Sequence, residues 1–188
     1  GVASGARVLD AGCGPGATLE FLAGAGLRPF GLDLAPGRPA PGSPPRVAGD
    51  AAALPFAEGA FAAVFCECVL SLLPEPGRAM AEFVRVLAPG GSLVLSDLFR
   101  PGSAPRPPAR EGSCAAGAFS FAEMFGMFAA NGLAPRAAEN HTRLLRELAA
   151  RLLFLGELDG CPSCATGYFL LVARKTGDGP CSTTPAFE

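Results

Sequence analysis

Short apolar runs alternate along this chain with segments whose apolar residues recur at helical spacing. The apolar runs cover residues 7–11, 28–34, 46–48, 61–68, 92–97, 133–142 and 167–175. The helical segments lie near residues 18–25, 80–87, 121–130 and 143–155. Strands that alternate with helices in this order are typical of a parallel sheet covered by helices on both faces. The pattern therefore predicts an α/β fold.

Two helical segments carry more specific signals. Residues 80–87 place apolar side chains at positions i, i+3, i+4 and i+7, which predicts a helix with an apolar stripe toward the sheet. Ser120 and Glu123 have the spacing of a capping box, and Asn131–Gly132 is a typical helix end. We therefore expect one helix to begin directly after Ser120.

Two proline-rich stretches interrupt the alternation. Residues 35–46 contain five prolines where an α/β unit normally carries a helix, so a loop is expected there. Residues 100–114 follow the fifth apolar run, at the end of the sheet where α/β proteins bind ligands. This second stretch is a candidate pocket wall or lid.

The length and charge of the chain limit its organisation and its partners. The 188 residues fit one compact domain, placed at residues 1–175, with residues 176–188 as a disordered tail. The 15 basic and 17 acidic residues form no basic stripe, which disfavours nucleic acid as a partner. No apolar run approaches the roughly 18 residues of a membrane helix. We expect a cytoplasmic protein with a small-molecule substrate, and a homodimer is left open.

Seven cysteines stand at positions 13, 66, 68, 114, 161, 164 and 181, an odd number without regular spacing. This favours reduced thiols over a disulfide framework. Cys66 and Cys68 are expected on the same face of their strand, and Cys161 and Cys164 form one C-x-x-C pair. The cysteines could bind a metalloid such as arsenite, or they could be small buried residues plus an incidental loop pair. We assign no metal site.

The stretch "LDAGCGPGA" at residues 9–17 follows the first apolar run and predicts a nucleotide-binding loop. Its glycines formally fit a dinucleotide site. Gly12 permits a tight turn, Gly14 permits close approach of a ligand, and Gly16 permits close packing of the next helix. The glycines alone do not distinguish a dinucleotide from another nucleoside ligand.

Three carboxylates at the ends of successive apolar runs help to distinguish a dinucleotide from another nucleoside ligand. Asp10 lies where a pyrophosphate would have to bind, and it repels phosphate but attracts a cation. Asp33 suits a ribose diol, because a carboxylate accepts two hydroxyl hydrogen bonds at once. Asp50 follows the third run and can meet an adenine amino group. The acidic positions therefore favour a cationic nucleoside ligand.

The segments "VLDAGCGPG", "GLDL", "GDAAALPF", "FAAVFCECVLSLL" and "VRVLAPGGSLVLSD" occur in this order. Together they resemble the successive motifs of class I S-adenosylmethionine-dependent methyltransferases, of the small-molecule type related to quinone-biosynthesis enzymes. The resemblance is dense over residues 6–99. It implies a Rossmann-like three-layer αβα sandwich with a seven-stranded sheet of order 3-2-1-4-5-7-6 and an antiparallel last strand.

The resemblance also implies a cofactor site for S-adenosylmethionine and its product, S-adenosylhomocysteine. The methionine part would be held by Asp10, Gly12, Cys13, Gly14 and Gly16, with Cys66 on the methionine side. Asp33 and Leu34 would hold the ribose and the adenine edge, and Asp50 and Ala51 the adenine. The family often carries N-terminal helices that close over the cofactor, whereas this sequence begins a few residues before the first apolar run. Either such residues lie outside this sequence, or the pocket is more open than usual.

Two residues are candidates for the chemistry. Glu67 follows the fourth apolar run and could orient or deprotonate an acceptor, or it could be a carboxylate without a chemical role. His141 is the only histidine and could act as a base at neutral pH or be structural. We predict methyl transfer to a small molecule. The alternatives are a silent cofactor-binding or partner-binding module, a thiol-dependent metalloid methyltransferase, and an NAD-dependent oxidoreductase.

Overall fold

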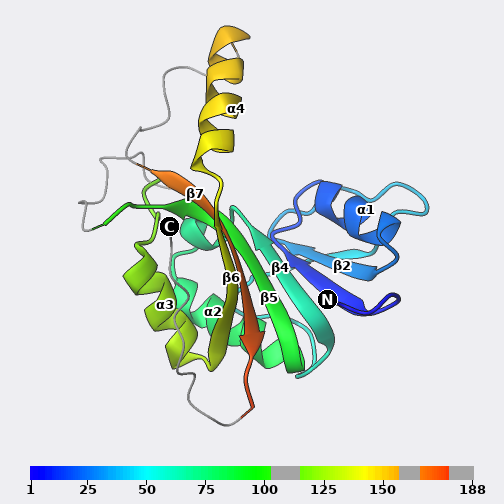
Figure 1. The fold of residues 1–188 in the computed structure, drawn as a ribbon. Helices are drawn as coiled ribbons and strands as arrows, with labels where there is room; N and C mark the ends of the chain where they lie inside the picture. Colours follow the sequence, from blue (N-terminus) through cyan, green and yellow to red (C-terminus); the bar gives the residue numbers. More distant parts are fainter. Residues whose placement is uncertain (103–114, 157–165, 178–188) are drawn as a thin grey trace.

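The computed structural model describes residues 1–102, 115–156 and 166–177, and within them seven strands form one sheet (Figure 1). The strands are β1 (Arg7–Ala11), β2 (Arg28–Asp33), β3 (Arg46–Ala48), β4 (Phe61–Glu67), β5 (Leu87–Phe99), β6 (Leu133–Asn140) and β7 (Gly167–Lys175). Their order is β3-β2-β1-β4-β5-β7-β6, and β7 runs antiparallel to both of its neighbours. The expected sheet order and its antiparallel strand are confirmed.

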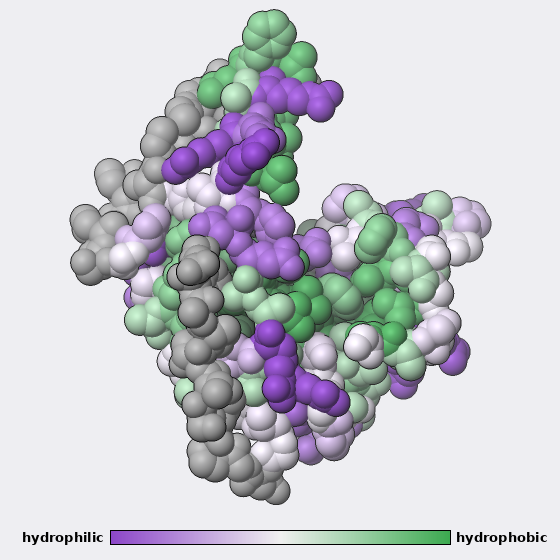
Figure 2. Space-filling view, in the orientation of Figure 1, coloured by the Kyte–Doolittle hydropathy of each residue, from purple (hydrophilic) through white to green (hydrophobic). Residues whose placement is uncertain are grey.

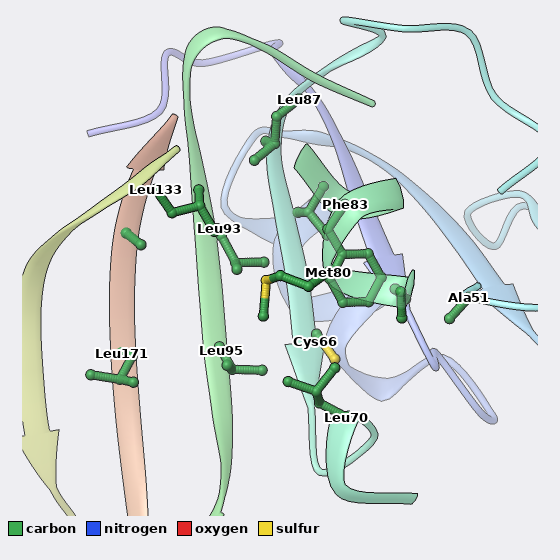
Figure 3. Packing of buried hydrophobic residues seen from close by; sticks show 14 of the residues in the cluster. Ala51, Cys66, Leu70, Met80, Phe83, Leu87, Leu93, Leu95, Leu133 and Leu171 are labelled. Carbon is green, nitrogen blue, oxygen red and sulfur yellow. The ribbon is translucent and has the colours of Figure 1, made fainter. Parts of the chain in front are cut away.

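Helices pack on both faces of this sheet. They are α1 (Ala17–Gly24) on one face and α2 (Pro76–Val86) and α3 (Phe121–Ala130) on the other. The short 3₁₀ helix η1 (Leu70–Leu72) follows β4, and α4 (Thr142–Phe154) projects beyond the sheet (Figure 1). On one face Val8 and Ala63 cluster with Leu22 of α1. Strand residues alternate between faces, and the main core on the other face contains Met80 and Phe83 of α2 (Figure 3). The expected three-layer arrangement is confirmed.

The helix expected after Ser120 begins as the sequence predicts. The Ser120 hydroxyl accepts a hydrogen bond from the Glu123 amide at 3.3 Å, and the Glu123 carboxylate accepts one from the Ser120 amide at 2.7 Å. The helix ends at its C-cap, Asn131. The capping box is confirmed, and it fixes where α3 leaves the loop that precedes it.

The boundary between α2 and β5 differs from the prediction. The apolar stripe was expected to continue through Leu87, but α2 ends at Val86 and Leu87 begins β5. Leu87 is fully buried in either assignment, because it faces the same core. β5 starts five residues earlier than predicted because its first part pairs with Phe61 of β4, and the pairing then shifts before Ser92. Gly90 and Gly91 therefore lie at an irregularity within one long strand.

The first proline-rich stretch is a loop, as predicted, with no helix or strand between Leu34 and Pro45. Most of the second stretch, residues 103–114, and the tail from residue 178 lie outside the described residues, so the lid and the tail remain predictions. No helix in the described part of the chain combines the length and the apolar character needed to cross a membrane. The single-domain division also remains a prediction.

Candidate functional site

A cavity of about 300 Å³, here called the first cavity, lies beside the glycine-rich loop, at the carboxyl ends of β1 and β2. Gly12, Asp33, Leu34, Asp50 and Ala51 contribute to its lining, and Val69 and Leu72 close the opposite side. Five of the residues expected to hold a cofactor therefore share one cavity. Its volume is at the lower end of the range for small-molecule sites.

The backbone of the glycine loop is held by its neighbour β2. The Gly12 amide donates to the Leu32 carbonyl at 2.7 Å, and the Gly14 amide donates to Asp33 Oδ2 at 2.9 Å. Asp33 Oδ1 accepts from the Ala35 amide at 2.9 Å. A carboxylate offers about four acceptor positions, so Asp33 can fix the loop and still accept bonds from a diol in the cavity.

Asp10 is the most unusual charged group of this region. Its side chain is 3% exposed, and its Oδ2 atom is buried without a hydrogen-bond partner. Burial raises the pKa of Asp10 to about 7, and the negative charges of Glu67 and Asp33 contribute to the rise. A buried carboxylate with an unpaired oxygen is costly unless a cation or a donor joins it. The residues present therefore fit a cationic ligand.

The same charges disfavour a dinucleotide. A pyrophosphate would lie at the N-terminus of α1, where the helix dipole favours an anion. Asp10, Asp33 and Glu67 surround this end of the loop closely enough for their charges to raise the pKa of Asp10. Arg46 lies against Gly16, but its guanidinium donates to the Pro15 carbonyl. The net charge facing a ligand is negative.

Other predicted cofactor residues lie in the cavity wall or at the start of α1. Leu34 is 75% exposed in the cavity wall, and Asp50 accepts a hydrogen bond from the Ala52 amide at 2.8 Å beside Ala51. Gly16 is the N-cap of α1. Leu34, Asp50 and Ala51 therefore share the first cavity and Gly16 precedes the first helix, while their roles toward an adenine stay predictions.

The two predicted cysteines are placed differently. Cys13 has its thiol beside the Cα of Gly31, and Cys66 is fully buried in the main core (Figure 3). Neither belongs to the lining of the first cavity. Burial raises the pKa of Cys13 to about 11 and also raises the pKa of Cys66, so both remain uncharged thiols. Both side chains therefore pack in the interior next to the site without lining the first cavity.

A second cavity, of about 460 Å³, lies between the end of β4 and α4, where Figure 2 shows a hollow beneath the projecting helix. Glu67, His141 and Tyr168 line it, together with leucines of α4. The Thr18 hydroxyl of α1 donates to Glu67 Oε2 at 3.1 Å. Glu67 therefore lies between the glycine loop and the second cavity, while His141 Nε2 pairs with Glu139 Oε2 at 2.9 Å.

The expectation that Cys66 and Cys68 share one face is wrong. β4 ends at Glu67, and Cys68 has a left-handed φ of +55°, which turns the chain out of the strand. Cys66 is consequently buried and Cys68 exposed. Within the described ranges no group of His, Cys, Asp and Glu could hold a metal ion. The remaining cysteines of the metalloid hypothesis, at positions 114, 161 and 164, lie outside those ranges.

The wall formed by η1 was not predicted from the sequence. The fully buried Asp97 carboxylate accepts from the Ser71 amide at 2.9 Å, from the Ser71 hydroxyl at 2.6 Å and from the Leu98 amide at 2.7 Å. Burial raises the pKa of Asp97, and these hydrogen bonds oppose the change. Asp97 thus fixes the helix that carries Leu72 into the first cavity.

Replacing Asp97 with Ala is expected to lower the free energy of unfolding by about 3 kcal/mol, because buried donors lose their partner. Chemical denaturation measures this loss. Ser71→Ala, which removes only one of the donors, is the matched control and is expected to cost about 1 kcal/mol. Equal effects of the two changes would contradict the role assigned to Asp97.

Comparisons with known proteins agree with this geometry. Residues 9–95 match the family model described as a methyltransferase domain. A demethylmenaquinone methyltransferase of Renibacterium salmoninarum is 42% identical over 106 residues, which are 54% of this chain and 45% of that protein. The chain thus spans less than half of the length of this curated relative.

Solved structures share the fold across most of the chain. Phosphoethanolamine N-methyltransferase 2 of Haemonchus contortus, solved in complex with S-adenosyl-L-methionine, has a TM-score of 0.76 at 16% identity, over 94% of this chain and 50% of that one. The cyclase SpnF has a TM-score of 0.74 at 23% identity, over 93% of this chain and 77% of that one. Residues 9–95 of this chain are thus similar to a methyltransferase domain, and the sheet order is the one implied by the resemblance to class I S-adenosylmethionine-dependent methyltransferases.

Proposed function

We propose that the chain binds S-adenosylmethionine in the first cavity and transfers its methyl group to a small-molecule acceptor. The observation that carries this proposal is the buried, unpaired Asp10 oxygen, which does not itself line the first cavity but stands two residues before Gly12, which does. Asp33 and Asp50 add further carboxylates to the lining. S-adenosylmethionine bears a sulfonium and an ammonium and no phosphate, so its charge complements this site. The family match over residues 9–95 supports the same ligand.

The residues of the loop would hold the ligand by its separate parts. Asp10 would pair with the cationic methionine portion, and Asp33 would accept hydrogen bonds from the ribose hydroxyls. Asp50 and Ala51 would meet the adenine, which lies against the apolar wall of Val69. Gly12 and Gly14 would allow close approach of the backbone.

The bound cofactor supplies a methyl group that its sulfonium has already activated. When bound, it would give this methyl to a nucleophilic atom of the acceptor, and the sulfur would keep the electron pair of the broken bond. If the acceptor atom carries a proton, that proton must leave it. The remaining requirements are alignment of the acceptor and exclusion of water. Glu67 is placed between the two cavities and would receive the proton.

Transfer of a labelled methyl group from S-adenosylmethionine to a panel of small hydroxylated, amine and thiol acceptors tests this proposal. Turnover that depends on the protein supports it. Normal binding of S-adenosylhomocysteine without turnover on any acceptor would instead favour a silent cofactor-binding module. Absence of both S-adenosylhomocysteine binding and turnover would contradict the proposal.

A Glu67→Gln variant is expected to lose turnover by about 100-fold or more, because the amide cannot accept the acceptor proton. Its affinity for S-adenosylhomocysteine is expected to stay within about threefold of the unmodified chain, since Glu67 does not line the first cavity and this product no longer carries the sulfonium charge that a carboxylate would favour. Steady-state kinetics and calorimetry measure the two quantities. Thr18→Val, which removes the contact with Glu67 but keeps the carboxylate, is the matched control. Unchanged turnover in Glu67→Gln would contradict the catalytic role.

The proposal keeps three expectations from the sequence. The acceptor is a small molecule rather than a nucleic acid, the protein acts in the cytoplasm, and a homodimer is compatible with both. The curated relatives are named for demethylmenaquinone, and a quinol is accordingly the first acceptor to include in the panel. Sedimentation of the purified protein at several concentrations tests the homodimer.

A further inference from the structure

We propose that the second cavity is the acceptor site and that it selects an amphiphilic molecule without an anionic group. Its hydroxyl group would bind at Tyr168 and Ser96, and its apolar body would lie along the leucines of α4. This inference rests on the proposed function, because the bound molecule is the one that receives the methyl group. It adds the chemical class of that molecule and the residues that select it.

The apolar side of the cavity comes mainly from α4. Leu144, Leu145 and Leu148 line it, and Leu144 and Leu148 remain 58% and 53% exposed. Figure 2 shows the helix projecting from the body with apolar side chains next to the hollow. Large exposed apolar side chains that gather at a cavity are typical of a ligand-binding surface. An apolar body of the acceptor would cover them.

The polar end of the cavity holds a network of uncharged groups next to the Glu67 carboxylate. The Tyr168 hydroxyl donates to Ser96 Oγ at 2.9 Å, and Cys68 Sγ lies 3.3 Å from the same hydroxyl. Burial raises the pKa of Tyr168, and the contact with Cys68 adds to this, so the hydroxyl stays protonated at neutral pH. Such a network can accept and donate hydrogen bonds, which suits an acceptor hydroxyl.

The charge of the described cavity lining disfavours an anionic acceptor. Glu67 contributes a carboxylate, and none of the described residues that line the cavity is Arg or Lys. His141 lines it as well, but its ring is already paired with Glu139. A carboxylate or phosphate on the acceptor would therefore be desolvated without compensation.

The orientation of the acceptor follows from Glu67. This residue contacts Thr18 at the start of α1 and also lines the second cavity. The polar end of the second cavity is consequently the end nearest the glycine loop, and the leucines of α4 form the far end. A hydroxyl at Tyr168 would thus face the first cavity, as methyl transfer requires.

The chain offers a direct probe of this site, because Tyr168 is its only tyrosine. Full-length protein labelled with fluorotyrosine gives one fluorine NMR resonance, which is followed in the presence of S-adenosylhomocysteine. Para-butylphenol is expected to shift this resonance at concentrations at least about tenfold below those needed for phenol or para-butylanisole. Phenol lacks the apolar chain, and para-butylanisole lacks the free hydroxyl. Equal effects of the three compounds, or no shift, would overturn the inference.

Two variants locate the apolar body. Leu148→Gln is expected to weaken para-butylphenol binding about tenfold, because one leucine contact is lost. Leu153→Gln changes the same residue type elsewhere on α4, 37% exposed and outside the cavity lining, and is expected to bind normally. Equal affinities of the two variants would overturn the placement on α4.

Affinity for S-adenosylhomocysteine separates the two proposals and confirms that each variant is folded. If S-adenosylhomocysteine does not bind the unmodified chain, the proposed function fails. If it binds and para-butylphenol leaves the Tyr168 resonance unchanged, only the acceptor site fails.

Discussion

An Asp10→Asn variant is expected to lose affinity for S-adenosylmethionine by about 100-fold and, without ligand, to be more stable than the unmodified chain above neutral pH. The two effects have one cause. The Asp10 carboxylate is buried with one oxygen unpaired, so its charge is unfavourable in the free protein and is compensated only by a cation. Asparagine has the same shape without the charge.

The direction of the expected stability change follows from the pKa of Asp10 in the unfolded and in the folded protein. Asp10 has an ordinary pKa of 3.8 and a pKa of about 7 in the folded protein. At a pH below the ordinary value the group is protonated in both states and costs nothing. As pH rises from 3.8 to about 7, Asp10 ionises in the unfolded chain before it ionises in the folded protein. The free energy of unfolding therefore falls over this range. Asp10→Asn is therefore expected to gain on the order of 2 kcal/mol at about pH 8 and almost nothing at about pH 4.

Ligand affinity is expected to change in the opposite direction. The cationic ligand favours ionised Asp10, so its affinity for the unmodified chain should rise with pH and level off above about 7. The variant should bind weakly and without this rise. Denaturation and calorimetric titration at several pH values measure both curves. A variant that binds as tightly as the unmodified chain would contradict the role of Asp10.

A Gly12→Ala variant is expected to lose about 3 kcal/mol of stability together with cofactor binding. Gly12 has a left-handed φ of +92°, and an added Cβ would lie 2.1 Å from Cγ2 of Val69. Val69 has no flexible end that could move aside, so either the loop or η1 must shift. Both border the first cavity. Thermal denaturation and titration with S-adenosylhomocysteine measure the two losses.

Gly14→Ala is the matched control for this change. Gly14 has a φ of +47°, and an added Cβ would meet nothing within 4 Å, so only the backbone preference is lost, about 1 kcal/mol. A Gly12→Ala, Val69→Ala double variant is expected to be less destabilised than the sum of its single changes, by about 1 kcal/mol. Strict additivity would mean that the two residues do not collide.

The acidic strand ends could be predicted from sequence because they are local features. Asp10, Asp33 and Asp50 each stand at or just after the end of an apolar run, and parallel strands bring such positions to one edge of the sheet. The glycine spacing indicated the loop in the same way. The start of the helix directly after Ser120 could also be predicted from sequence, since a capping box depends on two residues that are three positions apart.

The opposite wall of the first cavity and the whole second cavity could not be predicted from these local patterns. Tyr168 reaches Ser96 across 72 positions of the sequence, through the antiparallel pairing of β7 with β5. The contact of Ser71 with Asp97 spans 26 positions. Contacts of this kind depend on the strand order, which the sequence supplied only through its resemblance to a family.

The boundary errors have the same origin. Leu87 continues the apolar stripe of α2 and also begins β5, and both roles bury its side chain in one core. A periodic pattern records burial, and it does not record which backbone conformation achieves it. Cys68 is exposed because a left-handed backbone turn follows Glu67, a conformation that its residue type did not indicate.

The fold alone does not decide the chemistry, because a cyclase shares it with methyltransferases. The central claim is therefore tested most directly by the ligand. Calorimetric titration of the full chain with S-adenosylmethionine and, separately, with NAD measures it. We predict binding of S-adenosylmethionine with a Kd of about micromolar order and no heat with NAD. Binding of NAD without binding of S-adenosylmethionine would contradict the account.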